Sequence, residues 1–283
     1  MTARDPAVRD AELEAQVRRA QAGDRAALEA VVGAVQPQVH GLAWRFLWHP
    51  EDAEDATQEI LVRLVTRISS FRGESRFRTW MFQIACNALR TMRRRRMEER
   101  SMTIEAFAAD LAEGLSDGPI PTSPLVDEAL LLEEVKVGCT TAMLLCLDRE
   151  QRLAYILGEI LELDHRTAAE ALEVSPDAYR QRLSRARAAI VGLMRARCGL
   201  AHPENPCRCH RRAATAIARG HVDPQGLLFA TSAEQARRFP RVLAEIRKLD
   251  AMQRAAALHR SHVAPPATEE FSKWLRQLVE RAG

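Results

Sequence analysis

The sequence has little lysine, few aromatic residues and no long apolar run. Its 283 residues include 41 bases and 38 acids, for a net charge of +3. Lys136, Lys248 and Lys273 are the lysines, and every other base is arginine. So balanced a charge excludes a strongly basic field over the whole protein, and any affinity for nucleic acid has to come from local arginine patches.

The lack of apolar runs argues against membrane insertion and secretion. The longest uncharged stretch, residues 137–147, falls short of the roughly 18 residues that span a bilayer. The N-terminal residues are charged and lack the apolar core of a signal peptide. Six cysteines in a chain of this length do not suggest a disulfide scaffold. We therefore expect a cytoplasmic protein.

Apolar residues recur at helical rather than strand spacing. Ala56, Ile60 and Leu64 form one stripe at steps of four residues, and Ile84 and Ala88 continue the period in the next segment. Alternating runs of β-branched residues are nearly absent. The pattern predicts an all-α protein.

Composition divides the chain into four parts. Residues 1–100 form a first helical module, 101–128 a linker, 129–197 a second helical module, and 198–283 a cysteine-containing junction with a helical tail. The linker contains acids but no lysine or arginine, and its prolines and glycines interrupt regular structure. We expect it to be acidic and flexible.

The second module reads as a helix-turn-helix. A helix over 150–161 is followed by a short helix over 167–172, a four-residue turn, and a longer helix that Ser175 caps and Pro176 begins. The second helix of this motif enters the DNA major groove, where arginines neutralise phosphates and bind guanine. A solvated helix face is the alternative explanation for these arginines.

The first module combines an acidic helix with an aromatic, arginine-containing loop. Residues 51–59 are rich in acids, and residues 71–80 read Phe-Arg-Gly-Glu-Ser-Arg-Phe-Arg-Thr-Trp. Aromatic rings stack on unpaired bases while arginines hold the backbone, so the loop suits single-stranded nucleic acid. The same aromatics also fit a hydrophobic core.

Together these motifs resemble bacterial RNA polymerase sigma factors of the extracytoplasmic-function (ECF) group within the sigma-seventy family. Residues 52–59 are similar to the region two helix that docks on the polymerase clamp, 71–80 to the promoter-melting segment, and 84–87 to the helix that reads the minus-ten element. Residues 147–152 and the helix-turn-helix are similar to region four. The resemblance covers about residues 25–197, in the family's order.

The resemblance implies a promoter-recognition factor with core RNA polymerase and promoter DNA as partners, and with neither enzymatic activity nor a cofactor. It assigns polymerase binding to Asp52, Asp55, Gln58 and Glu59; minus-ten DNA binding to Phe71, Arg72, Ser75, Trp80, Asn87 and Arg90; and minus-thirty-five DNA binding to Tyr179, Arg180, Arg182, Arg185 and Arg187. A stand-alone helix-turn-helix regulator with a sensing tail is the alternative. That alternative leaves the acidic helix and the aromatic loop unexplained.

The C-terminal part of the chain extends beyond the resemblance. Cys198, Cys207, Cys209 and His210 fit a zinc site, with His202 between them, or else reduced free thiols or a redox pair. Apolar stripes on the tail predict helices that have to pack against something. Two roles are open for the tail. It regulates the factor from within the same chain, in place of or beside a separate anti-sigma protein, or it only stabilises the fold.

Overall fold

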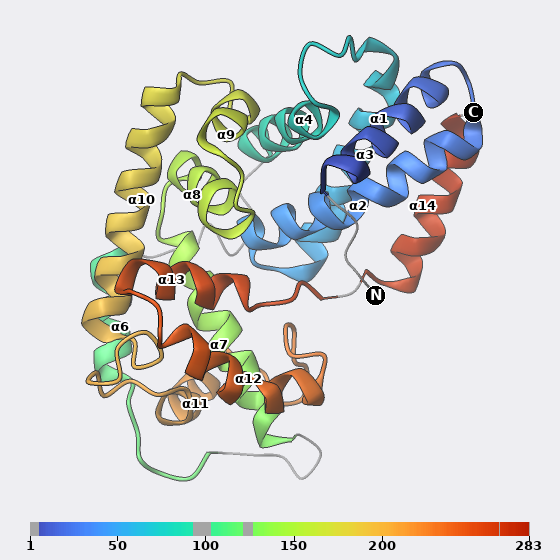
Figure 1. Cartoon of the computed structure of the whole chain (residues 1–283). Coiled ribbons are helices and arrows are strands. Elements are labelled where there is room, and N and C mark those ends of the chain that lie inside the picture. The colour runs from blue at the N-terminus through green and yellow to red at the C-terminus, as the bar shows by residue number, and fades with distance from the viewer. Residues whose placement is uncertain (1–5, 93–102, 121–126, 266, 283) are drawn as a thin grey trace.

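The computed structural model describes residues 6–92, 103–120, 127–265 and 267–282, and over these ranges it confirms the predicted all-α class. An isolated backbone bridge between Cys198 and Cys207 is the one extended pairing seen in these ranges. No helix in the described parts is both long and apolar enough to span a bilayer. Figure 1 shows two helical modules side by side, with the tail running below and across them.

The first module consists of α1 (Pro6–Gln21), α2 (Arg25–Leu47), α3 (Pro50–Arg67), the short η1 (Ile68–Ser70) and α4 (Phe77–Thr91). Asp24 caps α2 by accepting a hydrogen bond from the backbone N–H of Ala27. Pro50 stands in the first turn of α3, followed by two acids that favour the positive end of the helix dipole. The predicted stripes of α3 and α4 are buried in a shared core.

The second module contains α7 (Glu128–Leu145), α8 (Arg149–Tyr155), a π-helical turn η2 (Ile156–Ile160), α9 (His165–Ala171) and α10 (Pro176–Arg197). The helix-turn-helix comprises α9 and α10, and the Ser175 hydroxyl accepts from the N–H of Ala178, as the sequence predicts. A Cβ at Gly158 would lie 2.4 Å from the Tyr179 hydroxyl. Glycine there lets the ring of Tyr179 pack against η2.

The prediction of a flexible linker is wrong for its first half. Residues 104–113 form α6 (Ile104–Glu113), which Thr103 caps and which packs on α10. Phe107 and Leu111, one helical turn apart, are buried. The helix stops at Gly114, where the glycines and prolines begin. Acidic composition therefore concealed a short amphipathic helix. Residues 121–126 lie outside the described parts.

The tail forms four helices that contact both modules. They are α11 (Cys209–Ala218), α12 (Ala233–Ile246), α13 (Ala251–Arg260) and α14 (Glu269–Ala282). Helices α11 and α12 pack on α7, and α13 packs on α10, whereas α14 crosses to α2 and α3 of the first module (Figure 1). The predicted helical tail is confirmed, and it bridges the two modules.

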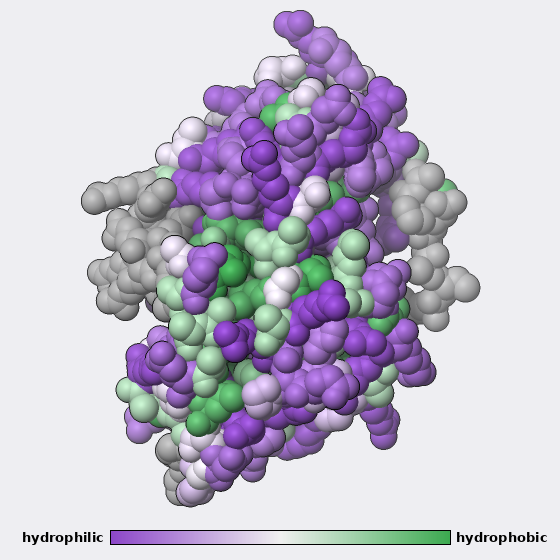
Figure 2. Space-filling model, turned by 90° about the vertical axis from the view of Figure 1, so that its left-hand side faces the viewer, coloured by the Kyte–Doolittle hydropathy of each residue, from purple (hydrophilic) through white to green (hydrophobic). Residues whose placement is uncertain are grey.

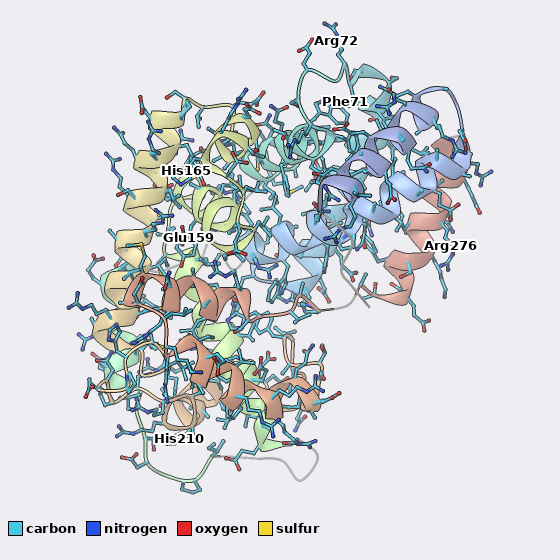
Figure 3. All side chains as sticks on the ribbon, viewed as in Figure 1. Phe71, Arg72, Glu159, His165, His210 and Arg276 are labelled. Carbon is cyan, nitrogen blue, oxygen red and sulfur yellow. The ribbon has the colours of Figure 1, made fainter. Side chains whose placement is uncertain are left out.

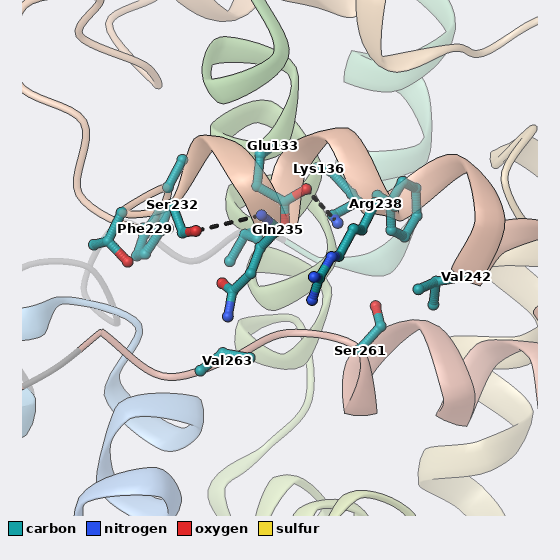
Figure 4. A pocket seen from close by; sticks show the side chains of 13 residues that line it. Glu133, Lys136, Phe229, Ser232, Gln235, Arg238, Val242, Ser261 and Val263 are labelled. Carbon is teal, nitrogen blue, oxygen red and sulfur yellow. Dashed lines mark hydrogen bonds and ion pairs between the residues drawn. The ribbon is translucent and has the colours of Figure 1, made fainter.

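A small groove marks the contact between α12 and α7. Lys136 is buried there, with its ammonium 2.6 Å from the Glu133 carboxylate and 3.3 Å from the ring centre of Phe239 (Figure 4). Burial lowers the pKa of Lys136, and the Glu133 carboxylate opposes that shift. The groove holds about 160 Å³, below the ~300 Å³ at which ordinary ligand pockets begin. It is therefore a packing feature between the tail and the second module.

Candidate polymerase and nucleic-acid interface

The acidic candidates for polymerase binding lie along α3. Asp55 and Glu59 are exposed and stand one turn apart, while Asp52 and Gln58 are half-buried. Glu59 forms an ion pair with Arg63 on the next turn. The structure therefore brings the four residues onto one part of the module surface, where positively charged protein can reach them.

The aromatic loop and the start of α4 form a ring cluster beside a cavity. The rings of Phe71, Phe77 and Trp80 have centres 5.3 to 5.6 Å apart, with Phe71 edge-on to Phe77 and the other two pairs tilted. Phe77 is buried, as the core interpretation expects, whereas Phe71 and Trp80 are half-buried. These two line a cavity of about 520 Å³ with Arg72, Ser75 and others. The cavity thus has the aromatic wall that a single unstacked base needs.

Polar groups of the aromatic loop complete the mouth of this cavity. Arg72 is exposed at the tip of the loop, and Figure 3 shows it extending away from the helices. Ser75 is half-buried behind it. Gly73 adopts φ of +75°, a left-handed conformation that side-chain-bearing residues rarely take, and so makes the turn possible.

The two polar candidates farther along α4 are half-buried and contact the second module. The Asn87 amide donates to the Glu173 carboxylate in the turn of the helix-turn-helix. Arg90 donates to Glu150 at 2.8 Å, and also to the Leu172 carbonyl at 2.9 Å. Asn87 and Arg90, which the sequence assigns to the minus-ten element, therefore have their polar groups bound to the second module. That module is the one assigned to the minus-thirty-five element.

The arginines of α10 differ in their surroundings. Arg180 and Arg185 are exposed, and Arg180 pairs with Asp177 on its own helix. Arg182 pairs with Glu150, and Arg187 donates to Glu159 at 2.6 Å. The upper part of the face that carries α10 is strongly hydrophilic in Figure 2. The helix thus offers a basic surface, part of which is engaged within the chain.

Tyr179 does not belong to that basic surface. Its side chain is fully buried, with its hydroxyl 3.5 Å from the Ala154 carbonyl oxygen and its ring edge-to-face with the ring of His165. Burial raises the pKa of its hydroxyl to about 12. Tyr179 begins the apolar stripe that continues through Leu183, so the spacing indicated a core position. The prediction that it contacts DNA is wrong for this conformation.

Sequence reasoning missed the residues that hold the modules together. Arg149 donates to the carbonyls of Leu89, Arg90 and Met92 at the C-terminal end of α4. Arg152 does the same for α2, donating to the Phe46 carbonyl at 2.8 Å. Cations favour the negative end of a helix dipole and satisfy its last carbonyls. Both arginines flank Glu150 at the start of α8.

Glu150 joins one arginine of each module. It accepts from Arg90 on α4 and from Arg182 on α10, and we call these three residues the inter-module cluster. The side chains are 38%, 19% and 31% exposed for Glu150, Arg90 and Arg182 respectively, so the pairs are partly shielded from water. The faces of the two modules that the sequence assigns to DNA are thus joined by the Glu150 carboxylate, in addition to the contact between Asn87 and Glu173.

The cysteine-containing junction does not form the zinc site that the sequence left open. Over the ranges that the structure describes, no group of three or more Cys, His, Asp or Glu side chains has an arrangement that could hold a metal. His210 is exposed and lies far from the aromatic loop in Figure 3. Burial raises the pKa of Cys207 to about 11, and that of Cys139 and Cys209 rises for the same reason. No disulfide joins any of the six cysteines, all of which lie within the described ranges, so all of them are free.

Comparison with known proteins identifies the two modules. Residues 31–99 match the Sigma-70 region 2 family, and residues 138–190 match Sigma-70, region 4. The chain is 31% identical to the ECF RNA polymerase sigma-E factor of Haemophilus influenzae, over 62% of this chain and 92% of that protein. The chain belongs to the ECF RNA polymerase sigma factors.

A second relative agrees with this membership. The RNA polymerase sigma-H factor of Pseudomonas aeruginosa is 29% identical over 62% of this chain and 89% of its own length. A solved structure of CnrH in complex with the cytosolic domain of CnrY is 24% identical, with a TM-score of 0.44, over 64% of this chain and 96% of that chain. The sigma factor's tail beyond the second module is an extension relative to these proteins.

Proposed function

We propose that this sigma factor binds core RNA polymerase in the cytoplasm and directs promoter-specific initiation without catalysing a reaction itself. The observation that carries the proposal is the pairing of two modules, one with an aromatic cavity for unpaired bases and one with an arginine-bearing helix for duplex DNA. A stand-alone regulator would need only the second.

Region 2 would bind polymerase through α3. Asp55 and Glu59 present carboxylates on successive turns, with Asp52 and Gln58 beside them. A carboxylate surface favours a basic partner, and like charges placed across such an interface cost several kcal/mol. The surface therefore provides both attraction and orientation for docking.

Strand capture would follow at the other end of region 2. A flipped base can stack on Trp80 and Phe71 once α9, which supplies part of the cavity wall here, withdraws with its module, while Arg72 holds the backbone. Ser75 lies at the cavity wall as a hydrogen-bonding group. Asn87 and Arg90 would read adjacent positions once they leave Glu173 and Glu150.

Duplex recognition would fall to α10. Arg185 is exposed and can reach phosphates or guanine edges, as can Arg180, which is exposed and pairs with Asp177 on its own helix. Arg182 and Arg187 extend the surface when their carboxylate partners release them. Tyr179 supports this helix from below by packing in the core. Arg180 and Arg185 therefore carry the first contacts.

Promoter recognition requires the modules to separate. The two promoter elements are centred about 25 base pairs apart, which is about 85 Å of B-form DNA at about 3.4 Å per pair. Here α4 contacts α9, and Asn87 touches Glu173. One compact chain cannot read both elements in this arrangement. We infer that it is the closed state and that polymerase binding opens it.

Transcription with purified core polymerase and a pool of promoter fragments tests the function. The full chain should give transcripts from a distinct subset of promoters, and Arg185→Ala should weaken that selection. Arg195→Ala is the matched control, since Arg195 is an exposed arginine in the last turn of the same helix. Failure of both the full chain and Glu150→Gln to bind core polymerase would overturn the proposal.

A further inference from the structure

Helix α14 covers one side of the region 2 surface assigned to polymerase. Its contacts are with α2 and α3, whereas helices α11, α12 and α13 pack on helices of region 4 (Figure 1). Glu54, which stands between the candidates Asp52 and Asp55 in sequence, accepts from the Thr268 backbone N–H at 2.7 Å and from its hydroxyl at 2.9 Å. Gln58 lies one turn after Glu54 on the same face.

The contact consists of the N-terminal cap of α14 and a buried aromatic side chain that follows it. The Thr268 hydroxyl accepts from the Phe271 N–H at 3.1 Å and so caps α14. Phe271 is 1% exposed and packs near the ring of His40 on α2, and Val279 is 4% exposed two turns later. We call the contact of Glu54, Thr268, Phe271 and His40 the α14 contact.

The size of a polymerase interface favours overlap with α14. A standard interface buries about 800 Å² on each partner. A strip along an 18-residue helix such as α3 is only about 27 Å by 10 Å, or about 270 Å². An interface centred on α3 therefore has to spread over neighbouring surface, and α14 occupies that surface on the Glu54 side.

The chain leading to α14 is buried at His262 and more lightly held beyond it, where the Pro265 backbone is hydrogen-bonded to His40. His262 is buried, with its ring 2.6 Å from the Thr140 hydroxyl, and its carbonyl accepts from Arg45. Val263, the next residue, is 62% exposed. Detachment of α14 can therefore begin after His262 and leave α13 in place. The tethered helix would remain close at high effective concentration.

We propose that α14 is an intramolecular competitor that covers the polymerase-binding face of region 2 and detaches when core polymerase docks. This inference rests on the proposed assignment of α3 to polymerase binding. The apparent affinity for core polymerase then equals the intrinsic affinity multiplied by the fraction of chains in which α14 is detached. If one chain in about ten is detached, removing the contact strengthens binding about tenfold.

The test compares Phe271→Ala with Gln277→Ala in the full chain. Phe271 anchors the contact, whereas Gln277 lies exposed on the same helix. We expect Phe271→Ala to bind purified core polymerase about tenfold more tightly and Gln277→Ala to bind like wild type. Hydrogen exchange should show faster exchange in α14 for Phe271→Ala, with α3 still protected. Thr268→Val, which removes the cap, is a second and milder variant.

Each outcome bears on one claim. Equal affinity for Phe271→Ala and Gln277→Ala, with α14 exchange raised only in the former, overturns the competitor proposal. Weaker binding by Phe271→Ala also overturns it, because α14 would then be part of the polymerase interface. The surface assignment is tested separately by Asp55→Arg with Glu59→Arg. If that pair leaves binding unchanged while Phe271→Ala strengthens it, the assignment to α3 falls and α14 covers a different docking site.

Discussion

Replacing Glu150 by glutamine should shift the closed state toward the open one. The substitution keeps the shape of the side chain and removes the charge that holds Arg90 and Arg182 together. Arg149 and Arg152 still bind the ends of α4 and α2, so the fold should survive. The variant therefore perturbs the contact between modules more than either module.

The size of the shift follows from the exposure of the inter-module cluster. Fully exposed ion pairs contribute about 0.2–1 kcal/mol, and hydrogen bonds to charged groups contribute about 1.5–3 kcal/mol. Glu150 is 38% exposed, so we expect each of its two ion pairs to contribute close to the value for exposed pairs, about 1 kcal/mol. Glutamine can still accept one hydrogen bond. A loss of about 1–2 kcal/mol corresponds to a change of about 5–30-fold in the closed-to-open ratio.

Fluorescence anisotropy with a random-sequence DNA duplex at fixed salt measures this change. Release of Arg182 should raise the affinity of Glu150→Gln several-fold over wild type. Removing any acid near α10 also strengthens DNA binding, so Glu170→Gln is the control: its carboxylate pairs with Arg166 within α9 and leaves the inter-module cluster intact. Equal gains for Glu150→Gln and Glu170→Gln would refute the reasoning.

Four further predictions concern binding and stability. Asp55→Arg with Glu59→Arg should abolish co-purification with core polymerase, because like charges then face each other. Trp80→Ala should give little transcript from duplex promoters and also from pre-melted templates. An α10 variant such as Arg185→Ala should regain transcription on the pre-melted templates. Tyr179→Ala should lose about 3–5 kcal/mol of unfolding free energy in urea melts, and Tyr179→Phe little. Burial holds the pKa of His262 well below normal, so urea melts should show stability falling as pH drops below about 6.5.

Local signals in the sequence determined the helices and the identity of the modules. Ser175 and Pro176 fix the start of α10 because a hydroxyl cap and a missing N–H are both local properties of a helix end. The four-residue steps of α3 and α4 predict which sides face the core, since burial of an apolar stripe depends on spacing alone. The same spacing placed Tyr179 in the core, against its assignment to DNA.

Only the tertiary structure decided what the polar residues do. Arg149 and Arg152 bind carbonyl oxygens at helix ends, and every residue has a carbonyl, so no partner can be read from residue type. Asn87 meets Glu173 across 86 positions of sequence. The stripe of α14 indicated that it had to be buried, but not that it would cross to region 2, because an apolar face fits many apolar surfaces. Contacts between modules depend on the path of the whole chain, which local patterns do not encode.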